Sequence, residues 1–189
     1  MKNKVKYNIS NVHYALITST DEGFNFGIPV PMPGAVSISL DPNGEPEAFY
    51  ADGIEYYTIS NNMGYDGDLE IALIPDSFRT DILKETVDAN NVLIENANSE
   101  TANFAILFEF DGDKHKIRHV MYNCSAARPS LAGQTNEDSR EVQPETLSLS
   151  SRPLPNGLVK ARTGNDTNTE AYSAWYSQVY LPVEEVGGP

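Results

Sequence analysis

The chain has 189 residues, and its 13 lysines and arginines against 27 aspartates and glutamates give a formal net charge of −14. This length suits one domain, residues 1–189, that is large enough to bury a hydrophobic core. The acidic balance repels a phosphate backbone and so disfavours nucleic-acid binding as the main function. The single cysteine excludes an internal disulfide, and no apolar run is long enough for a membrane anchor.

Alternation of apolar and polar residues predicts β-strands along most of the chain. The expected strands are residues 5–18, 35–40, 53–60, 67–74, 102–110, 114–124, 145–151 and 157–162. Turn residues at 21–23 and the sequence "DPNGE" at 41–45 close the first two strands. The connection 24–34 carries a proline at every second position from Pro29 to Pro33, which predicts an extended segment with little packing of its own.

Two segments have helical spacing instead. Residues 75–85, "PDSFRTDILKE", offer Asp76 or Ser77 as an N-cap. Residues 168–182, "NTEAYSAWYSQVYLP", form an apolar stripe that we assign to core packing and that Pro182 ends. The stripe consists of Tyr172, Trp175, Tyr176 and Val179. The expected fold is therefore mainly β, a β-sandwich or barrel-like domain with one or two short flanking α-helices.

Three regions are expected to lie outside this core. Residues 1–6 form a basic N-terminal arm, because Lys2, Lys4 and Lys6 are concentrated there. Residues 128–144 form a polar loop without periodicity, and loops of such length tend to be functional or disordered. Residues 183–189 are expected to be a mobile tail.

The stretch 104–124, "FAILFEFDGDKHKIRHVMYNC", predicts a β-hairpin with Asp111 and Gly112 as a two-residue turn. That register pairs Glu109 with Lys114, Phe108 with His115 and Phe104 with His119. It also places Cys124 on the face opposite to both histidines.

This hairpin concentrates residue types that could form a reactive site. On a strand, however, His115 and His119 stand about 13 Å apart, whereas zinc needs both nitrogens within about 2.1 Å of one ion. Cys124 faces away from them, so a Cys–His nucleophile pair is disfavoured too. The sequence holds no known catalytic or nucleotide-binding motif. We therefore expect no catalytic residue, metal or cofactor.

The residues considered so far leave two classes of function open. A carbohydrate- or receptor-binding β-sandwich module would use exposed tyrosines as a sugar platform. A hydrolase on a β scaffold would need a cleft that raises the pKa of a carboxyl group. The abundant acidic residues are compatible with the second class but do not indicate it.

Five segments together suggest a family. In chain order they are "PVPMPGAVSISLDPNGE" (29–45), "ALIPDSF" (72–78), "FEFDGDKHKIRHVMYNCSAARPS" (108–130), "TLSLSSRPLPNGLVKARTG" (146–164) and "YSAWYSQVYLP" (172–182). With this ordered set the chain resembles a phage major tail protein, the tail-tube subunit of long non-contractile tails in phages of Gram-positive bacteria.

The resemblance implies a tail tube domain that assembles as hexameric rings, which stack into the conduit for the phage genome. It implies no enzymatic activity and no cofactor, and it places the protein in the virion after synthesis in the host cytoplasm. The implied partners are the chain itself, tape measure, distal tail and terminator proteins, and genomic DNA in transient, non-specific passage. No appended immunoglobulin-like domain is expected. An acidic subunit suits the passage of a polyanion.

Self-association is expected to involve the basic arm, the loops 24–34 and 128–144, and a positive stripe on residues 114–124. Such loops would order on a neighbouring subunit. The candidate residues are Lys2, Lys4, Lys6, Lys116, Arg118, Arg128, Glu137, Asp138 and Arg140.

Overall fold

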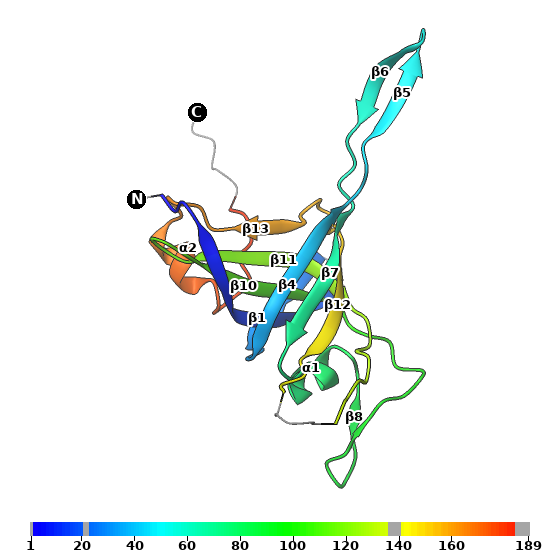
Figure 1. Ribbon diagram of the computed structural model, residues 1–189, viewed down its shortest axis with the longest axis vertical. Helices are drawn as coiled ribbons and strands as arrows, with labels where there is room; N and C mark the ends of the chain where they lie inside the picture. Colours follow the sequence, from blue (N-terminus) through cyan, green and yellow to red (C-terminus); the bar gives the residue numbers. More distant parts are fainter. Residues whose placement is uncertain (1, 21–22, 136–140, 184–189) are drawn as a thin grey trace.

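The computed structural model describes residues 2–20, 23–135 and 141–183 (Figure 1). As predicted, it is mainly β with two short helices, α1 (Asp76–Asp81) and α2 (Thr169–Ala174). The main sheet comprises β1 (Lys6–Thr20), β2 (Gly23–Phe26), β3 (Val30–Pro31), β4 (Ala35–Asn43), β7 (Gly64–Ile71), β10 (Phe104–Gly112), β11 (Ile117–Ala126), β12 (Glu145–Ser151) and β13 (Lys160–Arg162). Two separate pairs are β5 (Glu47–Ala51) with β6 (Ile54–Ile59), and β8 (Thr86–Val87) with β9 (Leu93–Ile94). No helix in the described part of the chain is long and apolar enough to cross a membrane.

The main sheet is antiparallel and runs in the order β2-β1-β10-β11-β12-β7-β4, with β13 on β11 and β3 on β1. The strand β11 pairs with two different strands along one edge. Its residues His119–Met121 pair with β13, and Cys124–Ala126 pair with β12. Between these halves β11 carries one residue more than β10, since Ile106 pairs with Met121 but Phe104 pairs with Cys124. Such a bulge bends a strand. The strands β12, β7 and β4 accordingly cross over β1, β10 and β11 as a second layer (Figure 1).

The larger hydrophobic core lies between these two layers. Phe104, Ile106 and Phe108 from β10 pack there with residues of β1, β7, β11 and β12. The helix α1 closes one end of this core with Phe78, whose ring meets the rings of Tyr14 and Phe104 edge to face. The prediction of a two-layer β fold is therefore confirmed.

A second core covers the opposite face of β10 and β11. Leu107, Val120 and Tyr122 pack there against Trp175 and Val179, which follow α2. Because β10 is buried on both faces, its sequence is nearly continuous in apolar residues rather than alternating.

The connection 24–34 packs against the rest of its own chain. The expectation of an extended segment with little packing of its own is therefore wrong. The strands β2 and β3 both pair with β1, and Met32, only 1% exposed, is part of the larger core. The Met32 amide donates to the carbonyl of Val12 at 2.7 Å. A short edge strand accommodates Pro31, because no further partner needs its missing N–H.

Both helices are shorter than predicted. The N-cap of α1 is Pro75, without a side-chain hydrogen bond, rather than Asp76 or Ser77. At α2 the Asn168 side chain accepts from the Glu170 amide, and the helix ends at Ala174. Trp175 and Val179 are nevertheless buried, as the apolar stripe predicted.

The register predicted for β10 and β11 is wrong by four residues at the Phe108 end and by five beyond the bulge. Phe108 pairs with His119, Glu109 with Arg118 and Phe104 with Cys124. Asp111 and Gly112 belong to β10, because this end of the strand pairs with β1. The connection 113–116 is held by Asn3, whose side chain bonds the Lys114 and His115 amides and the His115 carbonyl. A Cβ at Gly112 would overlap the backbone carbonyl oxygen of His115 as well as the Asn3 side chain, so glycine is needed there.

Candidate functional site

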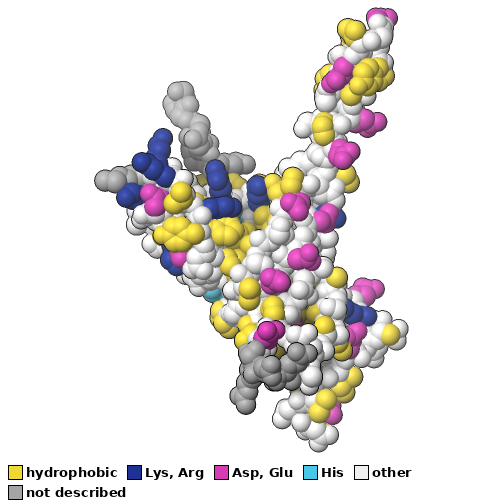
Figure 2. All heavy atoms as spheres, in the orientation of Figure 1, with side chains coloured by type: hydrophobic (Ala, Val, Ile, Leu, Met, Phe, Trp, Pro, Cys, Tyr) yellow, Lys and Arg dark blue, Asp and Glu magenta, His cyan; other side chains and the backbone are white. Residues whose placement is uncertain are grey.

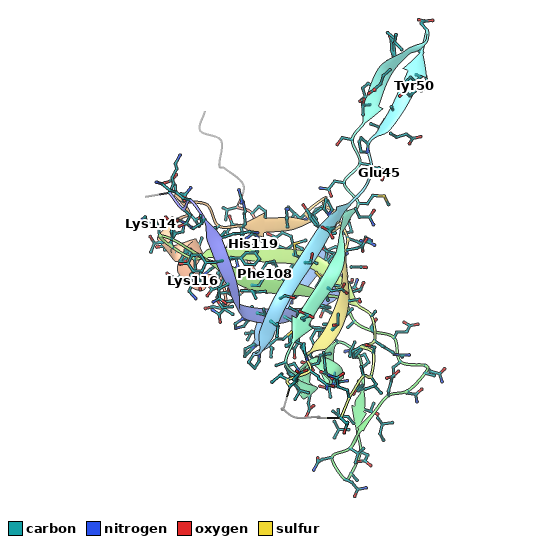
Figure 3. The ribbon with its side chains drawn as sticks, in the orientation of Figure 1. Glu45, Tyr50, Phe108, Lys114, Lys116 and His119 are labelled. Atoms are coloured by element: carbon teal, nitrogen blue, oxygen red, sulfur yellow. The ribbon has the colours of Figure 1, made fainter. Side chains whose placement is uncertain are left out.

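The pair β5–β6 projects away from the body of the molecule (Figure 1), and among the described residues its strands pair only with each other. We call residues 44–63 the projecting hairpin. Asp52 and Gly53 form its turn with φ of +54° and +78°, the signs of a type I′ turn, which favours an Asp-Gly sequence. Figure 3 shows Glu45 near the root of the hairpin and Tyr50 far out along it.

The surface of the projecting hairpin is apolar to an unusual degree. Its large exposed hydrophobic side chains are Phe49, Tyr50, Ile54, Tyr56, Tyr57, Ile59 and Met63. Soluble monomers rarely leave so many neighbouring apolar side chains in water, and such patches mark interaction sites.

Glycines hold the root of the projecting hairpin against the body. A Cβ at Gly44 would overlap the carbonyl of Asn61, and one at Gly64 would overlap the carbonyl of Ser151. Both residues have positive φ, which glycine adopts without strain. The Met63 amide donates to the Asn43 carbonyl at 2.9 Å. The direction in which the hairpin leaves β4 and β7 is therefore fixed by backbone contacts.

Charge is strongly segregated along the chain. No lysine or arginine lies between Lys6 and Arg79. The acidic residues in that interval are Asp21, Glu22, Asp41, Glu45, Glu47, Asp52, Glu55, Asp66, Asp68, Glu70 and Asp76. In Figure 2 acidic side chains accordingly lie along the hairpin, β4 and β7.

Basic side chains gather on the upper left of the body in Figure 2, across from the root of the projecting hairpin. We call Lys6, Lys160 and Arg162 the basic rim. They surround His119, whose pKa falls to about 4 because the ring is largely withdrawn from water and because these three cations lie near it. Within residues 2–20, 23–135 and 141–183, none of the three forms an ion pair.

Aromatic rings form the floor of the basic rim. The ammonium group of Lys6 lies 4.5 Å from the ring centre of Phe110, and that of Lys160 lies 4.2 Å from the ring centre of Tyr65. His119 stacks on Phe108 at 5.2 Å between ring centres. The rim therefore presents both positive charge and apolar surface.

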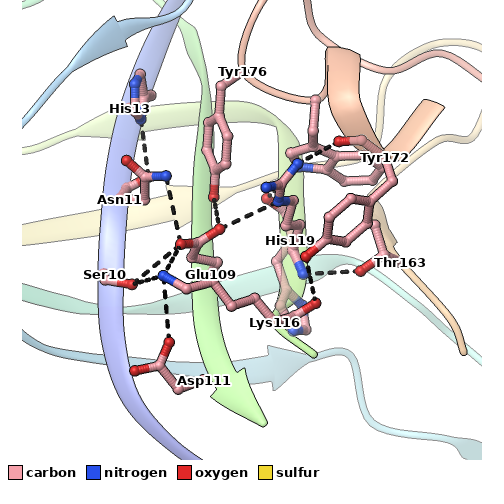
Figure 4. Close-up of polar contacts among 12 residues, drawn as sticks. Ser10, Asn11, His13, Glu109, Asp111, Lys116, His119, Thr163, Tyr172 and Tyr176 are labelled. Atoms are coloured by element: carbon pink, nitrogen blue, oxygen red, sulfur yellow. Dashed lines mark hydrogen bonds and ion pairs between the residues drawn. The ribbon is translucent and has the colours of Figure 1, made fainter. Parts of the chain in front are cut away.

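The predicted positive stripe of Lys116 and Arg118 is neutralised within the chain (Figure 4). Both cations bind Glu109, which is only 1% exposed: Lys116 Nζ lies 2.6 Å from Oε1 and Arg118 Nε lies 3.2 Å from Oε2. Ser10 and Asn11 also donate to Oε1. Burial of the carboxylate explains the arrangement, because a buried charge needs partners.

Glu109 and its partners also attach α2 and the residues that follow it, which we call the α2 segment, to the sheet. The Tyr176 hydroxyl donates to Glu109 Oε2 at 3.3 Å, and burial, with the nearby carboxylate, raises the pKa of Tyr176. Arg118 donates to the Tyr172 carbonyl and lies 3.9 Å from the Tyr172 ring centre. Arg118 is thus committed to internal packing in this chain.

The basic N-terminal arm lies along the β10–β11 connection. The Lys4 amide donates to Asp113 Oδ1 at 2.7 Å, and the Asn3 amide donates to Asn165 Oδ1 at 3.2 Å. Lys2 and Lys4 are exposed. The backbone of the arm is therefore docked while its cationic side chains stay accessible.

Of the remaining predicted assembly residues, the described part of the chain includes Arg128. Arg128 pairs with Glu95 at 3.1 Å and donates to the carbonyls of Asn96 and Ser99, so it braces the excursion that carries β8 and β9. Glu137, Asp138 and Arg140 lie outside the described residues, as does most of the predicted tail.

The histidines and the cysteine do not form a joint site. His115 lies in the β10–β11 connection and His119 lies within β11. Cys124 is buried in the larger core, on the same face as Met121 because of the bulge, and burial raises the pKa of its thiol to about 12. In the described part of the chain, no three His, Cys, Asp or Glu residues are grouped as metal ligands.

The projecting hairpin was not predicted as a unit from the sequence. Its second strand was predicted, but its first strand, Glu47–Ala51, was not. The Asp52-Gly53 turn between two aromatic-rich segments was the signal that could have revealed it.

Neither a protein-family model nor a curated relative matches the sequence. Among solved structures, the fold is similar to the anti-feeding prophage cap, the AFP tube terminating cap, determined by cryo-EM. The superposition has a TM-score of 0.46 at 12% sequence identity and covers 85% of this chain and 93% of that one.

Proposed function

We propose that this chain is a structural, non-enzymatic subunit of a phage tail that associates with itself. In its finer form, the proposal is a tail-tube subunit that stacks as rings, hexameric by resemblance, into the conduit for genome ejection. Its partners would be other copies and tail proteins such as the tape measure, distal tail and terminator proteins, within the virion. The five ordered segments of the sequence support the family.

The projecting hairpin carries the proposal. An isolated two-stranded hairpin is marginally stable in water, and this one exposes large apolar side chains on both strands. A surface of this kind is stabilised when another molecule covers it. A subunit that polymerises provides that cover with another copy of itself.

The exposed tyrosines also bear on the alternative, a carbohydrate- or receptor-binding module. Tyr50, Tyr56 and Tyr57 are all exposed on the hairpin. Sugar sites combine an aromatic platform with converging polar groups in a concave surface. Within the part of the chain that the structure describes, the strands of the hairpin pair only with each other, which favours a protein contact over such a site.

Sedimentation velocity and electron microscopy of the purified chain over a wide concentration range test the proposal. We expect rings or tubes, with association that increases with concentration. A chain that stays monomeric throughout and binds glycans on an array would overturn the proposal in favour of the binding module.

A further inference from the structure

We propose that the projecting hairpin of one copy docks on the basic rim of a second copy. This inference rests on the proposed function, since it names the two surfaces through which the subunits associate. It assigns Glu47 and Glu55 on one side, and Lys160 and Arg162 on the other, as the charged residues of the contact.

The hairpin supplies negative charge and no positive charge. Glu45, Glu47, Asp52 and Glu55 lie on it, and all four are exposed. At exposed sites, such charges steer association toward a surface of opposite sign. The partner surface should therefore be basic.

The basic rim meets that requirement. Lys6, Lys160 and Arg162 are exposed and lie together around His119. The other excursion from the body, residues 84–101, is itself acidic, with Glu85, Asp88, Glu95 and Glu100 against Lys84. Charge thus favours the rim over this excursion as the counterpart of the hairpin.

The apolar components of the two surfaces also fit each other. The rim carries Phe110 and Tyr65 under its cations, and the hairpin carries exposed phenylalanine and tyrosine rings. Cations that already lie over aromatic rings can be covered on their outer side by further rings, an arrangement that is favourable when desolvated. Burial of the hairpin's side chains would supply the hydrophobic part of the affinity.

The arrangement in Figure 1 makes the contact intermolecular. The hairpin leaves the body from β4 and β7 and points away, whereas β13 and the start of β1 lie across the body. A contact between two different surfaces is heterologous, so a copy whose hairpin is docked still has a free rim, and the copy that holds it still has a free hairpin. Such contacts repeat until a ring closes or a filament grows.

Paired charge reversal tests the contact. The variant Glu47→Lys with Glu55→Lys and the variant Lys160→Glu with Arg162→Glu should each weaken self-association about tenfold or more, because like charges then face each other. An equimolar mixture of the two variants pairs a reversed hairpin with a reversed rim and should recover association. The control is Glu100→Lys, which changes an exposed glutamate on the other excursion and should associate like the unaltered chain.

Zero-length carbodiimide cross-linking of the unaltered assembly, followed by peptide mapping, gives a second measurement. We expect links between hairpin glutamates and Lys160 or Lys6 of another copy. If the unaltered chain does not associate at all, the proposed function fails. If it associates but neither reversal weakens it and no such link is found, the proposed function stands and this contact is refuted.

Discussion

The strand pairs β10–β11 and β5–β6 are both antiparallel and rich in aromatic residues, yet they lie in opposite surroundings. The pair β10–β11 is covered on both faces, by the second layer of the sheet on one side and by the α2 segment on the other. On the pair β5–β6, residues 2–20, 23–135 and 141–183 place no second layer on either face. The first pair thus builds the fold, and the second presents a surface that the fold does not use.

The same dipeptide, Asp-Gly, behaves differently in the two pairs. At Asp52-Gly53 it forms the tight turn that its local preference dictates. At Asp111-Gly112 it continues a strand, because pairing with β1 and the contacts of Asn3 outweigh that preference. Local turn chemistry therefore decides the backbone where tertiary contacts are few.

The largest expected difference between the pairs comes from one substitution made in each. Phe108, 4% exposed, lies in the larger core, and Phe49 is 59% exposed. Phe108→Ala should lower the free energy of unfolding by about 4 kcal/mol through the cavity it leaves. Phe49→Ala should change it by less than about 0.5 kcal/mol and should instead weaken self-association. Urea unfolding and sedimentation velocity measure the two effects, and equal losses of stability would contradict the distinction.

Removing the charge of Glu109 tests how the buried pair is held. Glu109→Gln leaves Arg118 without its carboxylate in a largely buried position. We expect a loss of about 3 kcal/mol in unfolding free energy, as for other buried ion pairs that lose one partner. The matched change on the hairpin, Glu55→Gln, should leave thermal and urea unfolding unchanged. A stable Glu109→Gln protein would show that the α2 segment is held without the charge of Glu109, by its aromatic contacts and the Arg118 hydrogen bond to Tyr172.

The pH dependence of stability tests how far His119, within the basic rim, is withdrawn from water. His119 has a pKa of about 4 in the folded protein against 6.5 when unperturbed, chiefly because it is buried. Below pH 6.5 the unfolded chain takes up a proton that the folded chain does not, so stability falls from pH 6.5 toward pH 4 and this contribution then levels off. The loss between pH 7.5 and 4.5 should be about 2 kcal/mol smaller in His119→Phe than in the unaltered chain. Parallel profiles for the two proteins would place His119 in a more solvated setting.

Much of the fold could be predicted from the sequence. The strand β12 was predicted with its observed bounds, and the burial of Trp175 and Val179 followed from their helical spacing. The register of β10 and β11 could not be predicted in this way, because the bulge near Tyr122 and the contacts of Asn3 are long-range effects. A shift of this kind changes which side chains share a face.

The candidate site was less predictable, because burial is not visible in a local pattern. The alternation in β6 is the same whether a second layer covers it or not. Arg118 illustrates the converse: its charge suggested an exposed stripe, but the partner Glu109 lies on the neighbouring strand in a register the sequence did not reveal.

The smallest expected effect concerns the turn of the projecting hairpin. Gly53 has φ of +78° and open space around it, so Gly53→Ala should cost only about 1 kcal/mol of backbone strain. Because β5 and β6 have no other strand partner in the described structure, this cost should appear as faster hydrogen exchange within the hairpin, with global unfolding unchanged. The control is Gly64→Ala at the root, where the added Cβ overlaps the Ser151 carbonyl and should destabilise the body as well. If Gly53→Ala lowered the global unfolding free energy as much as Gly64→Ala does, the hairpin would be part of the folding core, and the contrast with β10–β11 would not hold.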